Sequence, residues 1–396
     1  MGNNQANQKE NQDSQNGVIF IQIPKVNYAS GELIEGTLHI SVLQQFQGNI
    51  LTICLEGIEE THFTYAVQIV KNGTYRQTYD KIEKHVGEGS KVFLNLAVPL
   101  YDFSNGMNDD NFMLMPGQWQ IPFQIQTSAG LPSSFKFQDD ESNYCSLKYT
   151  LKAFIIPSSS NGEKIQGSQE ISIRQQEKKD KKQELPNNQF TSEPIYCCCS
   201  TGSYHQKLSL DQRYYTPGQT IYATIDCDFS KFKEKVSSVD ISLYGNLNIK
   251  STSDPIRNKY FTMQSVSYEA KVENKKCKQV VRIDIPDNYP TSIKGQLIHI
   301  QFYIGVTPVI QSCCLGKESP LDLQVYINPK QGDNLPEMRQ IERPLNWNPE
   351  VLAVQIFNAK QASKFQNKTL NIFKGKRNRE AKANQMHQPQ MQNPLL

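Results

Sequence analysis

The chain has 396 residues and a formal net charge of +3. This length allows two domains with substantial cores, and a charge so close to balance argues against nucleic acid as a partner. No apolar run approaches the roughly 20 residues of a membrane-spanning helix. Residues 1–17 contain no apolar segment resembling a signal peptide, so we expect the nine cysteines to be reduced, in the cytoplasm.

Residues 1–17 are rich in Asn and Gln and are predicted to be a disordered N-terminus. Gly2 is a candidate lipidation site, because the first residues are close to the N-myristoylation pattern. That pattern prefers Ser or Thr where this chain has Ala6. One acyl chain anchors a protein only weakly, so Gly2 would need a second membrane contact.

Residues 18–174 are predicted to form a β-sandwich, because apolar residues recur with a period of two. Leu38, Ile40 and Val42 form one such row, which places His39 on the outward side. The clearest inward row is Cys145, Leu147, Tyr149, Leu151, Ala153 and Ile155. Residues 46–49 and 101–115 are expected to be loops, and loops on a rigid sandwich are candidates for partner contact.

Residues 175–200 are predicted to be a linker, since their first part is polar and charged. The linker ends in three consecutive cysteines, Cys197, Cys198 and Cys199. Three interpretations stay open for them: reduced structural thiols, S-acylation near a membrane, or metal binding together with Cys313 and Cys314. Adjacent thiolates fit a tetrahedral zinc site poorly, so no metal site is predicted.

Residues 201–329 are predicted to be a second sandwich that repeats the first. Residues 28–38 and 215–225 share Tyr, Gly, Ile and Thr at equivalent positions, and residues 53–57 are similarly echoed by 241–245. A repeat of this length indicates two copies of one domain. The residues expected to mark turns of this repeated fold are Gly31, Gly57, Pro217, Gly218 and Gly245.

Residues 330–396 are predicted to be a basic tail, partly helical or disordered. Residues 350–364 could form one amphipathic helix, with Leu352, Ile356 and Ala359 on one face. Residues 360–382 hold eight cations against one acid, Glu380. The candidates for contact with anionic lipid are Lys374, Lys376, Arg377, Arg379 and Lys382. A solvated tail and a nuclear-import signal are the alternatives.

Several segments, in the right order, resemble the arrestin family. Residues 28–36 resemble the opening of the arrestin N-domain, and residues 115–123 and 144–153 resemble its second half. Residues 197–199 with 214–218 resemble the start of the C-domain, and residues 292–308 its end. Between the N-domain segments lies the motif Leu131, Pro132, Ser133, Ser134 and Phe135. The resemblance is closest to the α-arrestins, also called arrestin-domain-containing proteins.

The resemblance implies an all-β chain of two tandem immunoglobulin-like β-sandwich domains. It also implies a non-enzymatic cytosolic adaptor, peripheral at the plasma membrane or endosomes, whose partners are cytosolic tails of membrane proteins and trafficking or ubiquitin-ligase components. No catalytic motif and no cofactor-binding pattern occurs, and the six histidines are scattered. The alternatives are a structural subunit of a retromer-like coat and a soluble scaffold with no membrane role.

The chain departs from the family pattern at three places. It contains no Pro-Pro-x-Tyr motif, with which α-arrestins bind ubiquitin ligases. Residues 370–374 end in a cation where a clathrin box has an acid. Glu170 aligns with the buried phosphate-sensing arginine of receptor arrestins, and a carboxylate there would repel phosphate. Activation by phosphorylated tails is therefore not expected.

Overall fold

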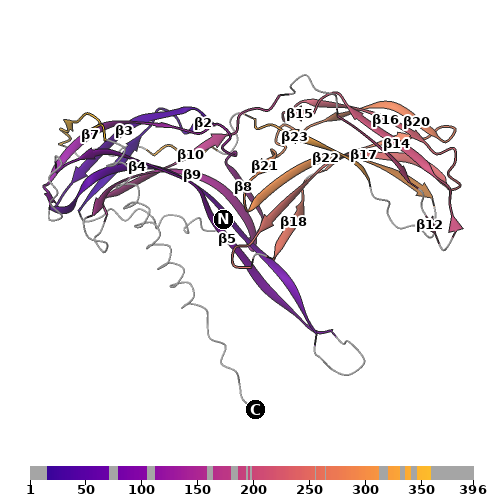
Figure 1. The fold of residues 1–396 in the computed structure, drawn as a ribbon, viewed down its shortest axis with the longest axis horizontal. Coiled ribbons are helices and arrows are strands. Elements are labelled where there is room, and N and C mark those ends of the chain that lie inside the picture. The colour runs from indigo at the N-terminus through magenta and orange to yellow at the C-terminus, as the bar shows by residue number, and fades with distance from the viewer. Residues whose placement is uncertain are drawn as a thin grey trace, which may run out of the picture.

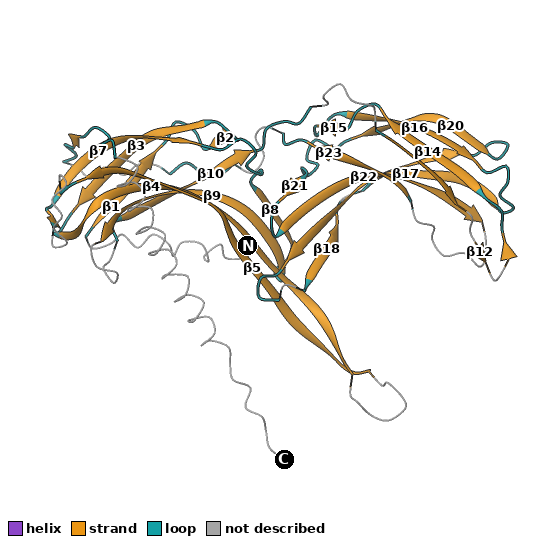
Figure 2. Cartoon of the chain, in the orientation of Figure 1, coloured by secondary structure: helices purple, strands orange, loops and turns teal. Residues whose placement is uncertain are grey.

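The computed structural model describes residues 16–70, 79–104, 112–157, 164–179, 186–192, 195–196, 199–254, 256–263, 265–311, 320–330, 335–339 and 346–357. They form two β-sandwiches that lie side by side, and a long hairpin projects from the junction between them (Figure 1). Throughout these ranges the regular secondary structure is β-strand and no helix occurs (Figure 2). The predicted all-β fold of two tandem domains is confirmed.

The first sandwich packs a four-stranded sheet, in the order β1-β3-β7-β24, against a seven-stranded sheet, in the order β2-β10-β9-β4-β5, with β6 paired to β4 and β8 to β9. The strand bounds are β1 Gly17–Gln22, β2 Asn27–Ala29, β3 Leu33–Val42, β4 Phe46–Val70, β5 Tyr79–Asp102, β6 Met113–Leu114, β7 Gly117–Gln126, β8 Phe135–Asp140, β9 Asn143–Pro157, β10 Gln166–Arg174 and β24 Glu350–Val351.

The second sandwich repeats this plan, with sheets ordered β11-β14-β16-β20 and β15-β23-β22-β17-β18, while β19 and β21 join the larger sheet and β12 pairs with β13. The bounds are β11 Asn187–Ser192, β12 Ile195–Tyr196, β13 Cys199–Ser200, β14 Tyr204–Leu210, β15 Tyr214–Tyr215, β16 Thr220–Asp228, β17 Lys235–Lys250, β18 Asn258–Thr262, β19 Val266–Lys271, β20 Lys276–Asp284, β21 Ile293–Lys294, β22 Ile298–Gln311 and β23 Leu321–Ile327.

The apolar rows in the sequence form the cores of both sandwiches. All six members of the row from Cys145 to Ile155 on β9 are buried, and so is the equivalent row on β22 from Ile298 to Val306. On β16 the burial alternates strictly, with Ile221, Ala223, Ile225 and Cys227 inside. A period of two places one face of each sheet on the core, which is why the sequence predicts these strands well.

The glycines of the repeat have two different roles. Gly31 and Gly218 have φ angles of +85° and +88°, a region that favours glycine, and each follows a short strand, β2 or β15. The turns expected at Gly57 and Gly245 are absent, because both residues lie inside long strands. A Cβ on Gly57 would lie 2.6 Å from the ring of Phe93, and one on Gly245 would lie 2.4 Å from Phe302. These two glycines make room for aromatic rings.

Two predicted non-strand segments are strands in the structure. Residues 187–192, expected in the linker, form β11 and pair with β14. Residues 46–49, expected as a loop, begin β4, and Phe46 is buried against β6. In both cases a neighbouring strand edge supplies backbone hydrogen bonds that the local sequence does not reveal.

Four buried thiols should resist alkylation. Burial raises the pKa of Cys54, Cys145 and Cys227 to about 12 and raises that of Cys277 as well. At pH 8 these groups stay thiols, and the thiolate is the reactive species. Iodoacetamide followed by peptide mass spectrometry should leave all four unmodified in the native protein and modify them in urea. Equal rates in both states would contradict the buried positions.

Candidate functional site

The junction between the sandwiches is centred on the projecting hairpin of β4 and β5 (Figure 1). These strands have 25 and 24 residues and pair along nearly their whole length. Their proximal halves belong to the first sandwich, and their middle contacts the second sandwich through polar side chains. The hairpin is therefore attached to both domains at its base.

Glu59 on β4 is the central contact of the junction. Its side chain is 1% exposed, and its carboxylate accepts hydrogen bonds from the backbone N–H groups of Gln296, Leu297 and Ile298 at 2.9, 2.6 and 3.0 Å. Successive backbone amides in a turn form a concave anion site. Here the site lies between β21 and β22 of the second sandwich, and the anion comes from the first.

Gly295 allows this approach. A Cβ at position 295 would lie 2.7 Å from both carboxylate oxygens of Glu59, closer than any real contact. Thr61, two residues along β4, donates from Oγ1 to the carbonyl of Lys250 at 2.6 Å. Burial, and secondarily the charge of Glu59, raises the pKa of nearby Cys145 to about 12. The interior side of β4 therefore carries polar groups that reach across to the second domain.

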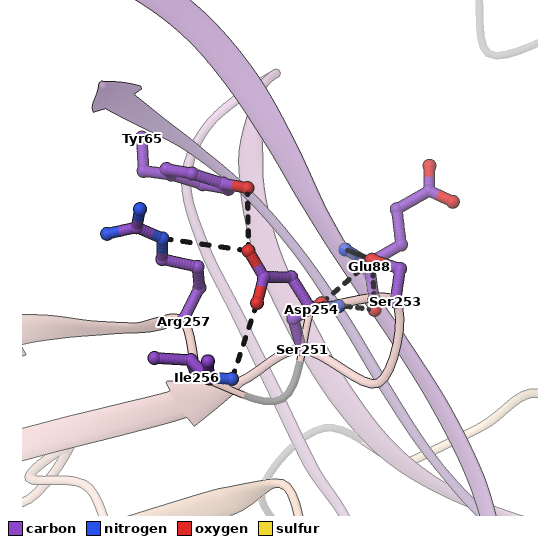
Figure 3. Close-up of polar contacts among 7 residues, drawn as sticks. All are labelled: Tyr65, Glu88, Ser251, Ser253, Asp254, Ile256 and Arg257. Carbon is purple, nitrogen blue, oxygen red and sulfur yellow. Dashed lines mark hydrogen bonds and ion pairs between the residues drawn. The ribbon is translucent and has the colours of Figure 1, made fainter. Parts of the chain in front are cut away.

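A second cluster lies further along the hairpin (Figure 3). The carbonyl oxygen of Glu88 on β5 accepts hydrogen bonds from Thr252 N at 2.8 Å, Ser253 N at 3.1 Å and Ser251 Oγ at 2.8 Å. The hydroxyl of Tyr65 donates to Asp254 Oδ2 at 3.3 Å. These contacts fix the loop between β17 and β18 against the hairpin.

Cations of the second sandwich complete the cluster. The Arg257 guanidinium lies 5.2 Å from the centre of the Tyr65 ring and its Nε lies 3.6 Å from Asp254 (Figure 3). Lys259 Nζ donates to Asn143 Oδ1 at 2.6 Å and to the carbonyl of Thr64 at 3.2 Å. With the Glu59 site, these bonds hold the two sandwiches in one arrangement.

Beyond these contacts the hairpin presents apolar side chains to solvent. Ile82 and Val86 on β5 are 65% and 50% exposed. His85 points to the opposite face of the strand, where its ring stacks on Tyr65 beside the second sandwich. Ile82 and Val86 therefore lie on the face turned away from that contact. One face of the hairpin thus contacts the second sandwich, and the other face is exposed to solvent at Ile82 and Val86.

Residues 346–357 return from the second sandwich to the first. Glu350–Val351 form β24, which pairs in parallel with β7, and Leu352 N donates to the carbonyl of Gln120 at 2.9 Å. Gln355 donates from its N–H to the carbonyl of Leu100 at 2.9 Å, and its Oε1 accepts from Asp102 N at 2.8 Å. This C-terminal segment covers the edge of β7.

Two expectations about this region are wrong. The predicted helix from residue 350 is absent where the structure describes it, up to residue 357, because the edge of β7 offers backbone partners for an extended chain. Ile356, expected on the apolar face of that helix, is 99% exposed. His39, expected to face outward, is 2% exposed, because the Trp347 ring lies 5.7 Å from its ring and Gln22 bonds its Nε2 at 2.7 Å.

The segment of Leu131, Pro132, Ser133, Ser134 and Phe135 connects three strands. Leu131 N donates to Ser30 Oγ at 2.9 Å, and the Pro132 carbonyl accepts from the Tyr149 hydroxyl at 2.7 Å. Ser133 Oγ and Ser134 Oγ accept from the backbone of Gln175 and Ile173, each at 3.0 Å. The motif stabilises the end of β10, from which the chain leaves for the second sandwich.

The other sequence-predicted residues that the structure describes lie away from the junction. Pro217 precedes Gly218 in the turn after β15. Glu170 is exposed on β10, so this position holds no buried charge, and the residues on either side of it, Gln169 and Ile171, are both buried. Cys199 lies in β13. Gly2, Cys197 and Cys198 and the five basic residues from Lys374 to Lys382 lie outside the described residues.

The junction is built from hydrogen bonds between the two sandwiches. In the described portion of the chain no three metal-ligating side chains gather, and no helix there is long and apolar enough to cross a bilayer. Glu59, Asp254 and Lys259 are engaged in hydrogen bonds across the junction. Arg257 pairs with Asp254 within the second sandwich and lies over the Tyr65 ring of the first. The geometry of the junction suits it to fixing the position of the projecting hairpin.

Comparison with known proteins gives two domain matches. Residues 18–183 match the family model described as arrestin (or S-antigen), N-terminal domain, and residues 200–330 match the corresponding C-terminal domain. A relative is arrestin domain-containing protein A of Dictyostelium discoideum, 21% identical over 225 residues, which are 56% of this chain and 36% of that protein. The match thus spans about a third of the length of that relative.

Proposed function

Since the chain belongs to the arrestin family, we propose that it is a non-enzymatic adaptor that links membrane-protein cargo to sorting, endocytic or ubiquitination machinery. The observation that carries the proposal is the hairpin of β4 and β5. It is anchored at its base by Glu59 and Tyr65, and it exposes Ile82 and Val86. Rigid support with apolar side chains at a projecting element suits protein recognition.

In this proposal the partner is the cytosolic tail of a membrane protein, and the chain acts at the cytoplasmic face of the plasma membrane or endosomes. The absence of a Pro-Pro-x-Tyr motif means that a ligase would be recruited by another route. The exposed face of the hairpin replaces residues 46–49 as the candidate contact, because Phe46 is buried in β4.

Site-specific photo-crosslinking in cells tests this function. A photoreactive amino acid placed at Ile82 or Val86 should capture cytosolic segments of membrane proteins. The matched control is Val280, which is 62% exposed on β20 of the second sandwich. Membrane-protein adducts at positions 82 and 86 but not at 280 support the adaptor. Adducts only with soluble coat subunits at near-equal stoichiometry would instead favour a coat component.

The basic region from Lys374 to Lys382 should provide an anionic-lipid contact. Each cation near an anionic surface contributes about 1 kcal/mol. Full-length protein should co-float with phosphatidylserine vesicles at low salt, and less at physiological salt. A chain ending after residue 357 keeps the C-terminal segment on β7 and should lose this binding. Equal flotation of both chains would exclude the basic region as the contact.

A further inference from the structure

A small apolar cluster lies on the outer face of the larger sheet of the first sandwich. It consists of Ile50 and Cys54 on β4, Ala97 on β5 and Phe154 on β9, and each of them is at most 7% exposed. Successive residues of a strand point to opposite faces, and Ile53, next to Cys54, belongs to the main core. We call this group of four residues the outer cluster.

The outer cluster is buried more deeply than a bare sheet face allows. The outer face of an antiparallel sheet commonly meets water, and on the same face of the neighbouring β10 both Gln166 and Glu170 are exposed. The described contacts of β4 with the second sandwich begin further along the strand, at Glu59. Thr52, between the two cluster residues of β4, is also 1% exposed. Another segment must therefore cover this part of the sheet.

The C-terminal segment leads the chain toward this face. β24 lies at the edge of β7 in the smaller sheet, and Gln355 lies at the edge of β5 in the larger one, where it bonds Leu100 and Asp102. The chain thus crosses from the edge of one sheet to the edge of the other. β5 carries Ala97 of the outer cluster, and β4 and β9 follow it in the order of the sheet. The residues after Gln355 therefore arrive beside the outer cluster.

The chain beyond residue 357 has the length and the composition to cover the outer cluster. Crossing from β5 to β9 takes two strand spacings, about 10 Å. Residues 358–373 span about 24 Å even at the rise of a helix. Burial of apolar surface favours an apolar cover, and this segment contains four large apolar side chains, Phe365, Leu370, Ile372 and Phe373.

The other segments that adjoin the first sandwich are polar. Residues 105–111 and 158–163 follow strands of the larger sheet, and together they contain one apolar side chain, Met107. Residues 1–15 contain only Met1 and Ala6. We propose that residues 358–373 of the same chain lie across the outer cluster and bury it. A partner that binds this face would first have to displace the segment.

Alkylation of Cys54 tests this proposal. In a chain ending after residue 357, iodoacetamide under native conditions should modify Cys54 at least tenfold faster than in the full chain, as measured by peptide mass spectrometry. Cys145 on β9 is the internal control, because it lies in the main core and should stay unmodified in both chains. A chain ending after residue 373 keeps the covering segment without the basic region and should still protect Cys54.

Two variants of the full chain separate the cover from the length of the chain. Phe365→Asp with Ile372→Asp places charges in the covering segment and should expose Cys54 as the truncation does. The matched control is Met386→Asp with Met391→Asp, the same kind of change beyond residue 373, which should leave Cys54 protected. Thermal unfolding checks that both variants fold.

A photo-crosslink identifies the covering segment directly. A photoreactive phenylalanine analogue at position 365 of the full chain should form intramolecular adducts with peptides of β4, β5 or β9. The proposal is wrong if Cys54 stays protected in the chain ending after residue 357. It is also wrong if no adduct forms with these strands, or if the adducts join two copies of the chain.

Discussion

Replacing Glu59 with Ala should lower the free energy of unfolding by roughly 3–6 kcal/mol. The carboxylate accepts three backbone hydrogen bonds in a buried site. Its loss leaves three amides of the second sandwich without their partner, at about 1–2 kcal/mol each. Urea denaturation of the full chain measures the change. Glu59→Gln should have a smaller effect, because one side-chain oxygen remains to accept.

The neighbouring Glu60 provides the matched control. Its side chain is 45% exposed and lies 3.7 Å from Lys148, so it forms a surface ion pair. Glu60→Gln should change stability by less than about 1 kcal/mol. Gly295→Ala approaches the same site from the second sandwich and should also destabilise it. Equal, small effects of Glu59→Ala and Glu60→Gln would contradict the central role of Glu59.

Removing the C-terminal segment, residues 346–357, should destabilise the protein somewhat less than Glu59→Ala does. A chain ending after residue 345 loses Trp347 from beside His39 and Leu352, which packs against the core. Both are partly buried, and the lost burial amounts to about 2–4 kcal/mol. Hydrogen exchange should show the amide of Asp102, which donates to Gln355, exchanging at least tenfold faster.

The chain ending after residue 357 is the control for this deletion. It keeps β24, Trp347 and Gln355, so exchange in β7 and at Asp102 should match that of the full chain. If the chain ending after residue 345 also keeps the protection of the Asp102 amide, then residues 346–357 do not pack on the first sandwich.

The sequence predicts both sandwiches because their strands are regular. Apolar residues recur with a period of two in rows such as Ile221, Ala223, Ile225 and Cys227, and this spacing places them on one face of a strand but not of a helix. The repeat around Gly31 and Gly218 marks the same turn in both domains. The order of strands in the two halves then follows from duplication. Both signals depend only on residues close together in the sequence, and the structure contains the strands and turns that they predict.

The junction is less visible in the sequence because its contacts join residues far apart. Glu59 gives one signal: it occupies an inward position of β4, in line with Ile53 and Leu55, where an apolar residue is expected. Its partners are backbone amides, which carry no side-chain pattern. The burial of His39 and the extended conformation of residues 350–357 are missed for a related reason. Residues 346–357 pack on the first sandwich, where Trp347 lies beside His39 and β24 pairs with the edge of β7, and the local sequence pattern shows neither contact.

The distance between the two sandwiches in solution shows whether the junction fixes them. Ketone-reactive spin labels on unnatural amino acids at Gln124 of β7 and Thr224 of β16 leave the nine native cysteines untouched. Double electron–electron resonance should give one narrow distance distribution for the wild type and a broader one for Glu59→Ala. A broad or bimodal distribution in the wild type would contradict a junction that fixes the two sandwiches.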